Sequence, residues 1–396
     1  MRSKLLLAAI VLLTGCVGTG ASGALSESLG AGRWEAAAQE GGRGERQFNL
    51  GAGKRLDVKL RTGGAVDITG WDNDTASVSA SVSGENAADI DLSYTPTAEG
   101  LQIVSRYTGP RRRSYNSDVR LEIKVPRRTD ILLETMGGDI KINGVEGDMR
   151  GQTMGGRLDL SDLKGTLALS TMGGGITLKQ SNVNGKVSTM GGEVLLEDVT
   201  GDVKGSSMGG KVTYKNVTNS KGETTGQEVK ITSMGGEINV DTAPAGADVS
   251  TMGGDIDIRS AAKFVKANTM GGDIRLGAVD GGIKATTMGG DVNARMVGNP
   301  DDGPRDVTIT SMGGDIFLTV PAGLSMDIQI EIARTRNSGK TPQIVSDFPV
   351  QQRESDEWIA DQGTPRKVTY GTGQVGGGRN KITIKTINGD VHLKKG

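Results

Sequence analysis

The sequence predicts an all-β parallel solenoid (β-helix-like), built from coils of about 18 residues and closed at both ends by β-rich caps. The tripeptide Met-Gly-Gly occurs ten times, and seven of the nine steps between successive copies are 18 residues long. Apolar residues alternate after most copies, which is the period-two pattern of a strand. Glycine makes up 63 of the 396 residues, and it suits a recurring corner because it tolerates positive φ and close backbone approach.

The composition excludes several classes of function. One His and one Cys are too few ligands for a Cys/His zinc site, and a disulfide needs a second Cys. A Ser-His-Asp triad would depend on His392 alone. The formal net charge of -1 gives no overall positive field for nucleic acid. We therefore expect no metal or other cofactor and no nucleic-acid partner.

Residues 1–15 are expected to form a lipoprotein signal peptide. Arg2 and Lys4 precede an apolar run at 5–13, which is too short to cross a membrane because a spanning helix needs about 20 apolar residues. The run ends in L-T-G-C, which resembles the lipobox of bacterial lipoproteins. The resemblance implies diacylglycerol on the Cys16 sulfur, cleavage before Cys16 and acylation of the new N-terminus, with fatty acids such as palmitate. The alternative is an ordinary cleaved signal peptide with an incidental Cys.

Residues 16–44 are rich in Gly, Ala, Ser and Glu, a composition typical of a flexible tether. No later segment is apolar enough to span a bilayer. We therefore expect a membrane lipoprotein of the bacterial cell envelope, facing the periplasm or the cell exterior. Two or three acyl chains would hold it firmly, because each buried CH2 contributes ~0.8 kcal/mol.

Residues 45–130 are expected to form an N-terminal β region that caps the solenoid. Strand-like runs occur there, among them RLDVKL at 55–60 and DVRLEIKVP at 118–126. The segment RTGGAVDI at 61–68 is similar to a degenerate first repeat. Capping is needed because an uncovered end of a parallel stack exposes unpaired backbone groups.

Residues 131–335 form the predicted MGG-repeat solenoid, with two or three short strands in each coil. Stacked strands lie ~4.8 Å apart, so ten coils span roughly 50 Å. The steps of 26 and 24 residues contain polar inserts at 218–228 and 299–305, which are expected to be loops at one corner. The corner glycines are Gly137, Gly138, Gly155, Gly156, Gly173, Gly174, Gly191, Gly192, Gly209, Gly210, Gly235, Gly236, Gly253, Gly254, Gly271, Gly272, Gly289, Gly290, Gly313 and Gly314.

The methionine of each repeat allows two interpretations. We favour a stack in the core or at the corner, where an unbranched side chain fills a gap that recurs in each coil. The alternative is a thioether ladder for Cu(I), a soft metal. Thr or Ser precedes every Met-Gly-Gly, but this single column lacks the two-column T-x-T array of an ice-binding surface.

A carboxylate follows the glycines in the last four repeats and would recur every ~4.8 Å if the register holds. These residues are Asp255, Asp273, Asp291 and Asp315. One interpretation is a divalent-cation site, and the other is a solvated corner beside Arg259, Arg275 and Arg295. We favour the solvated corner, because the unit lacks the G-G-x-G-x-D pattern of calcium-binding repeats.

Residues 336–396 are expected to form the C-terminal β cap. TINGDV at 386–391 is similar to a degenerate last repeat. The run at 371–376 fits G-x-G-x-x-G, but two further glycines and a strand-like segment follow it, so we interpret it as a turn. His392 is expected on a surface or edge strand. The basic run at 111–113 is interpreted as a solvated loop, with contact to anionic headgroups or glycans as the alternative.

Over residues 45–396 the chain resembles bacterial envelope β-strand-repeat proteins of unknown function, which carry the family label "putative adhesin". The resemblance rests on GWD at 70–72, VP at 125–126, the repeated T-x-G-G-D-I units, SDFP at 346–349, and the closing GGG and TINGDV. It implies an envelope protein with adhesive or structural roles, and it provides no catalytic residues to transfer.

No irregular cluster of carboxylates marks a catalytic groove in the sequence. We therefore expect a non-catalytic protein that presents a β-solenoid surface to an envelope polysaccharide or protein partner. The alternative is a solenoid enzyme that acts on polysaccharides as a lyase or hydrolase, which needs grouped carboxylates or a carboxylate beside Arg or Lys.

Overall fold

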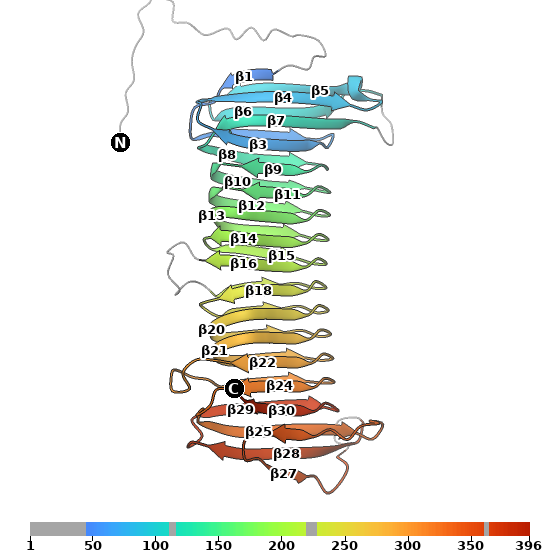
Figure 1. Cartoon of the computed structure of the whole chain (residues 1–396). Helices are drawn as coiled ribbons and strands as arrows, with labels where there is room; N and C mark the ends of the chain where they lie inside the picture. Colours follow the sequence, from blue (N-terminus) through green and yellow to red (C-terminus); the bar gives the residue numbers. More distant parts are fainter. Residues whose placement is uncertain (1–44, 111–115, 219–227, 360–363) are drawn as a thin grey trace, which may run out of the picture. The chain divides into compact units, whose positions relative to one another are not determined.

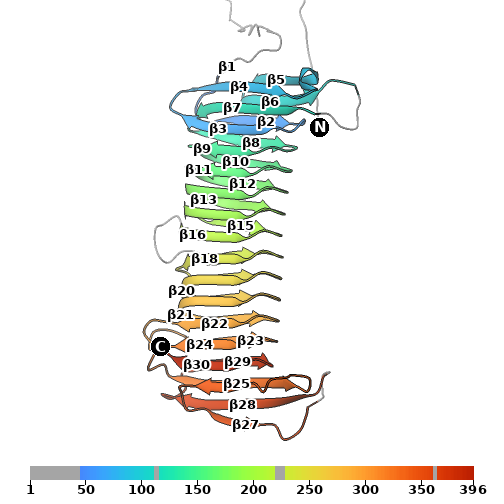
Figure 2. The same ribbon diagram turned by 45° about the vertical axis from the view of Figure 1, so that its right-hand side comes forward.

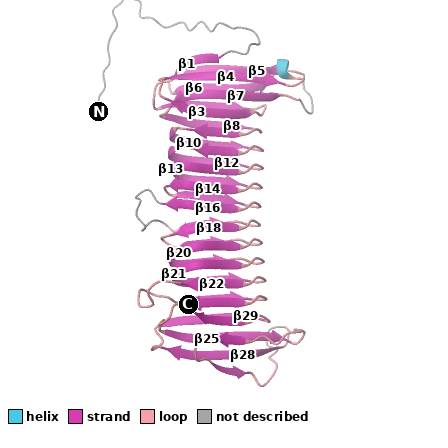
Figure 3. Ribbon diagram, viewed as in Figure 1, coloured by secondary structure: helices cyan, strands magenta, loops and turns pink. Residues whose placement is uncertain are grey.

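The computed structural model describes residues 45–110, 116–218, 228–359 and 364–396. These residues form strands almost throughout, with one short 3-10 helix, η1 (Ala87–Asp89), among them. The strands wind into a parallel solenoid with two strands per coil, so the predicted fold class is confirmed (Figure 1, Figure 3). Within the described ranges, no helix has the length and hydrophobicity that crossing a bilayer would require.

Each coil has two faces, joined by its Met-Gly-Gly turn. Strands of the entry face end at the turn: β8 (Thr129–Thr135), β10 (Glu146–Thr153), β12 (Lys164–Thr171), β15 (Val203–Ser207), β17 (Val229–Thr232), β19 (Ala247–Ser250) and β23 (Val307–Ser311). Strands of the exit face begin after it: β9 (Ile140–Asn143), β11 (Leu158–Ser161), β14 (Val194–Thr200), β16 (Val212–Thr218), β18 (Ile238–Ala243), β22 (Val292–Met296) and β24 (Ile316–Val320).

Three longer strands connect the faces at the corner opposite the turns. They are β13 (Ile176–Thr189), β20 (Ile256–Asn268) and β21 (Ile274–Thr287). The first part of each pairs with exit-face strands and the second part with entry-face strands. All thirty strands of the described residues are therefore hydrogen-bonded into one continuous sheet.

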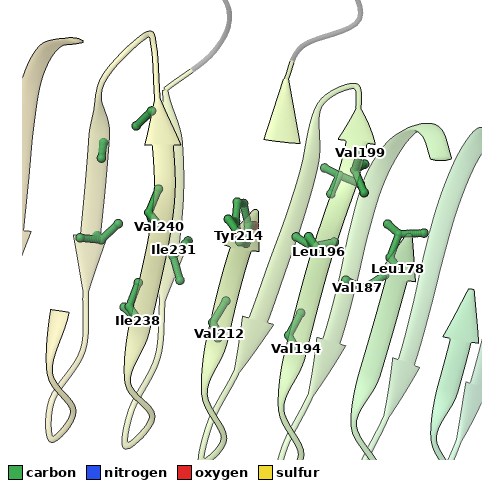
Figure 4. Close-up of a cluster of buried hydrophobic side chains, with 14 of the residues drawn as sticks. Leu178, Val187, Val194, Leu196, Val199, Val212, Tyr214, Ile231, Ile238 and Val240 are labelled. Carbon is green, nitrogen blue, oxygen red and sulfur yellow. The ribbon is translucent and has the colours of Figure 1, made fainter. Parts of the chain in front are cut away.

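The core consists of columns of apolar side chains, one from each coil. Ile176 pairs with Val194, Val194 with Val212, and Val212 with Ile238, so equivalent positions of successive repeats are directly stacked. These side chains are almost completely buried between the two faces (Figure 4). The period-two pattern puts every second residue inside, and the repeat length keeps the columns in register.

A second corner lies opposite the Met-Gly-Gly turns. Five residues spaced 18 apart have φ between 48° and 70° there: Gly144, Asp162, Gln180, Asp198 and Asn216. The left-handed conformation costs roughly 1–2 kcal/mol for most L-residues, and Gly, Asn and Asp tolerate it best. The repeat period therefore fixes both corners of the coil.

The insert of the tenth repeat leaves the column on the side of this second corner (Figure 2). It follows β22 and contains turns, so the predicted loop is confirmed at this position. Arg305 returns from it to the interior, where its guanidinium donates to the carbonyl oxygens of Val297 at 2.7 Å and Asp302 at 3.0 Å. Most of the other insert, residues 219–227, lies outside the described residues.

The N-terminal end begins with a coil that lacks methionine. Its strands, β2 (Lys54–Leu60) and β3 (Ala65–Trp71), pair in parallel with β8 and β9, so RTGGAVDI contains the turn of this coil. Outside it lie β1 (Glu45–Asn49), β4 (Thr75–Ser83), β5 (Ile90–Thr97), β6 (Gly100–Tyr107) and β7 (Asp118–Pro126). The pairs β1–β4, β4–β7 and β5–β6 are antiparallel, which ends the parallel stack.

The C-terminal end is built in the same way. The strands β29 (Asn380–Ile387) and β30 (Val391–Lys395) form a last coil on β23 and β24, with TINGDV at its turn. Outside it lie β25 (Met326–Thr335), β26 (Ile344–Ser346), β27 (Gln351–Glu354) and β28 (Arg366–Val375). The pairs β25–β28 and β27–β28 are antiparallel.

Candidate functional site

The ten methionines of the repeats form one column on the solvent side of the turns, which we call the Met column. Their side chains are 43–59% exposed, whereas those of Met149, Met296 and Met326 are at most 2% exposed. The stack therefore lies at the corner, and its alternative placement in the core is wrong. The members of the Met column are Met136, Met154, Met172, Met190, Met208, Met234, Met252, Met270, Met288 and Met312.

A groove of about 900 Å³ follows the first six members of the Met column. The groove is lined by the methionine thioethers. On the entry face it is also lined by the residue two positions before each methionine. These residues are Glu134, Gln152, Ser170, Ser188, Ser206 and Thr232. The groove is thus a long apolar strip bordered by hydroxyl and amide groups, with Leu60, Arg61 and Lys59 at its N-terminal end.

The two glycines of each turn differ in the space around them. A Cβ on the second glycine would lie 1.8–2.3 Å from the carbonyl oxygen of the equivalent glycine one coil earlier, at every one of the ten turns. A Cβ on the first glycine would meet nothing closer than 3.5 Å. Among the twenty, only Gly138 has a φ in the left-handed region. Close stacking of the coils, rather than positive φ, therefore explains the second glycine.

The Thr or Ser before each methionine forms a buried ladder of hydroxyls. These side chains are at most 4% exposed. In eight repeats, from Thr153 to Ser311, the hydroxyl donates to the carbonyl oxygen of the second glycine one coil earlier, at 2.8–3.2 Å. The hydroxyl oxygen of the same Thr or Ser accepts the N–H of the second glycine in its own turn. The ladder joins consecutive turns and presents no hydroxyl row to solvent, as an ice-binding surface would.

The carboxylate column also links consecutive coils. One oxygen of each aspartate accepts the backbone N–H of the equivalent residue in the next coil, at 2.7–2.9 Å. The acceptors are Asp255, Asp273, Asp291 and Asp315, and the last donor is Asp390. Sequence reasoning missed this role, which depends on the offset between coils.

Arginine neutralises part of this column. The Arg275 guanidinium lies 3.2 Å from Asp255 and 2.7 Å from Asp273, and the hydrogen bond that it donates to Asp255 raises the pKa of Arg275. Arg259 pairs with Asp241 instead. These ion pairs support the interpretation of the column as a solvated corner beside arginine. Across the described ranges, no three His, Cys, Asp or Glu side chains converge as a metal site would require.

Neither His392 nor the run at 371–376 lines the groove. The run at 371–376 lies mostly in β28, and only Gly376 belongs to the turn that leads into β29, so the expectation of a turn over the whole run is wrong. The His392 ring stacks on Phe317, with ring centroids 4.6 Å apart, on β30. Cys16 and the basic run at 111–113 lie outside the described residues.

A family model and two solved structures are similar to this chain. The family model described as Toastrack DUF4097 matches residues 53–346. No curated protein matches the chain. One similar solved structure is a "putative cell adhesion protein" from Clostridium sporogenes ATCC 15579, with 10% identity over 90% of this chain and 100% of that chain and a TM-score of 0.17.

A second is a "putative adhesin" from Parabacteroides distasonis ATCC 8503, with 11% identity over 70% of this chain and 97% of that chain and a TM-score of 0.26. The family match includes the N-terminal coil, all ten Met-Gly-Gly turns and the strands between them. The resemblance found in the sequence is thereby confirmed. This chain belongs to the Toastrack DUF4097 family.

Proposed function

We propose that this protein is a non-catalytic, lipid-anchored component of the bacterial cell envelope that uses the groove beside the Met column for adhesive or structural contact. The exposure of ten thioethers in one line is the observation that carries the proposal. A contiguous exposed apolar strip marks an interaction surface in a soluble domain. Methionine suits such a surface, because its flexible, polarizable side chain adapts to different partners.

The chemistry of the groove fits an extended partner, either an envelope polysaccharide or a protein segment. Thioethers can pack on the apolar faces of sugars or side chains, while Ser170, Ser188 and Ser206 offer hydroxyls along the same line. The direction of the groove follows the stacking of the coils, so a chain-like partner meets a thioether and a neighbouring polar side chain at each ~4.8 Å step.

The contact role is tested by measuring binding to a panel of envelope polysaccharides and proteins. Replacing Met172 and Met190 by Glu puts charge into the groove and should weaken binding at least about ten-fold, a loss of ~1.4 kcal/mol. Val345→Glu is the matched control, because Val345 is an exposed apolar residue on β26, outside the groove. Equal binding by both variants would contradict the proposal.

The same panel separates contact from catalysis. Sustained turnover of a polysaccharide, lost when one or two carboxylates are replaced by amides, would establish the enzyme alternative. Binding without turnover supports a contact role.

Lipid anchoring is a separate part of the proposal. We expect Cys16→Ser to abolish incorporation of labelled fatty acid and to release the protein from membranes, because the acyl chains provide the attachment. Unchanged membrane retention would contradict the anchor and leave the contact surface untouched.

A further inference from the structure

The turns do not need methionine for their own stability. Their bonds come from the backbone and the hydroxyl ladder: the Met172 N–H donates to the Thr153 carbonyl at 3.2 Å, and the Gly191 N–H donates to the Met172 carbonyl at 3.1 Å. The thioether itself is half in solvent in all ten repeats. The ten sulfur atoms are therefore open to reaction with solutes, whether or not a partner also contacts the column.

We propose that the Met column is an oxidant-scavenging site, whose substrates are two-electron oxygen donors of the hypohalous acid or peroxide class. With hypochlorous acid, the sulfur attacks oxygen, the S–O bond forms and the O–Cl bond breaks. Sulfur loses two electrons, chlorine leaves as chloride, and the proton of the acid goes to water. Each thioether thus becomes a sulfoxide and consumes one oxidant molecule.

The structure explains how the protein can take up ten oxygen atoms and remain folded. A sulfoxide formed at the Met column is already hydrated, and no bond of the turn involves the sulfur. A sulfoxide in the core would be a buried polar group without a partner, which is destabilising. The three buried methionines are shielded from that reaction by the coils around them.

The chain contains its own control for this proposal. The purified full-length protein is treated with increasing equivalents of hypochlorous acid, and each methionine is followed by peptide mass spectrometry. We expect the members of the Met column to gain one oxygen each, at least about ten-fold faster than Met149, Met296 and Met326, because susceptibility follows exposure. Circular dichroism should show that the β structure persists when all ten are oxidised.

A variant with all ten members replaced by Leu tests whether the thioethers consume the oxidant. It keeps an apolar side chain of similar size, so the fold is expected to survive, and it should consume about ten equivalents less before buried residues react. A second variant, Met172→Leu with Met190→Leu, gives the same readout at two sites should the larger variant not fold.

Similar rates of oxidation for exposed and buried methionines, or unfolding before the column is fully oxidised, would overturn the proposal. The test does not depend on any binding partner.

Discussion

The second glycine of each turn has no room for a side chain. A Cβ at Gly156 would lie 1.8 Å from the Gly138 carbonyl oxygen, which is backbone and cannot rotate away. The coils would have to separate locally, and the parallel ladders on both sides of the turn would be strained. The constraint acts between coils, because the second glycine of each turn lies over the second glycine of the preceding coil.

We predict that Gly156→Ala lowers the free energy of unfolding by about 2 kcal/mol or more, within the range of backbone clashes. Gly155→Ala is the matched control, because a Cβ there would meet nothing within 4 Å. Urea unfolding of both variants measures the difference. Equal effects would show that the two glycines share one role and that the close approach is not decisive.

The hydroxyl ladder makes a prediction at Thr171. Thr171→Val keeps the shape of the side chain but removes the hydroxyl that donates to the Gly156 carbonyl at 2.8 Å. A buried carbonyl without a partner costs about 1–3 kcal/mol, so we expect a loss of that size in thermal or urea unfolding. Thr166→Val is the control: its hydroxyl bonds Asp148 at an exposed position, and its loss should be near zero.

Neighbouring coils are also joined by the aspartates after the turns. Asp273 accepts the Asp291 N–H through one oxygen, and an amide oxygen can accept the same bond. We predict that Asp273→Asn keeps the stability of the wild type, while Asp273→Ala loses about 1 kcal/mol. If Asn is as damaging as Ala, and calcium or magnesium raises the melting temperature of the wild type, the column is a cation site.

The last coil and its cap should be sensitive to acid. Burial raises the pKa of Asp390, but hydrogen bonds from Lys340 and from the Gln343 N–H outweigh it, so the pKa lies below its ordinary value of 3.8. A carboxylate with a lowered pKa contributes stability above its unfolded pKa and loses it as the pH falls through the folded value.

We therefore predict that the melting temperature of the wild type falls more steeply below about pH 4 than that of Asp390→Asn, which has no carboxylate to protonate. Above about pH 5 the wild type should be the more stable of the two, because its ion pair with Lys340 is intact. Parallel pH profiles would show that Asp390 does not control the acid response.

The stack as a unit should tolerate changes of length only in steps of one coil. Removing residues 172–189 joins Thr171 to Met190 and restores every register, so we expect a folded protein shortened by ~4.8 Å. Removing residues 172–180 deletes half a coil and places exit-face residues on the entry face. We expect that variant to lose cooperative thermal unfolding. Circular dichroism and small-angle scattering test both, and equal behaviour would contradict the role of the period.

Much of this architecture follows from the sequence because the repeat is a property of spacing. The recurrence of Met-Gly-Gly gave the coil, and alternation at positions such as Ile140 and Ile142 identified the inward side chains. The two ends were also recognisable, since TGGAVDI and TINGDV preserve the pattern in weaker form. These inferences need only one coil and the rule that it repeats.

The functions of single residues at the turn were harder to predict, because they depend on the adjacent coil. Alternation along the entry strand puts Leu167 and Thr171 inside and therefore Met172 outside, but the prediction from sequence did not extend the pattern to the turn. The hydrogen bond from the Asp291 N–H to Asp273 depends on how neighbouring coils are positioned along the stack. The distance between repeats in the sequence does not encode that position. The left-handed corner at Asp162, Asp198 and Asn216 does have a signal in its residue types, and a search for turn-forming residues at the same period would find it.

The identical register of successive coils has a genetic consequence. The gene encodes tandem segments that share a length and the Met-Gly-Gly motif, so an unequal exchange between equivalent points adds or removes whole coils in frame. Each product keeps both antiparallel ends and every internal column. The number of coils, and with it the length of the solenoid, can therefore change in evolution one coil at a time, without any change in the two caps.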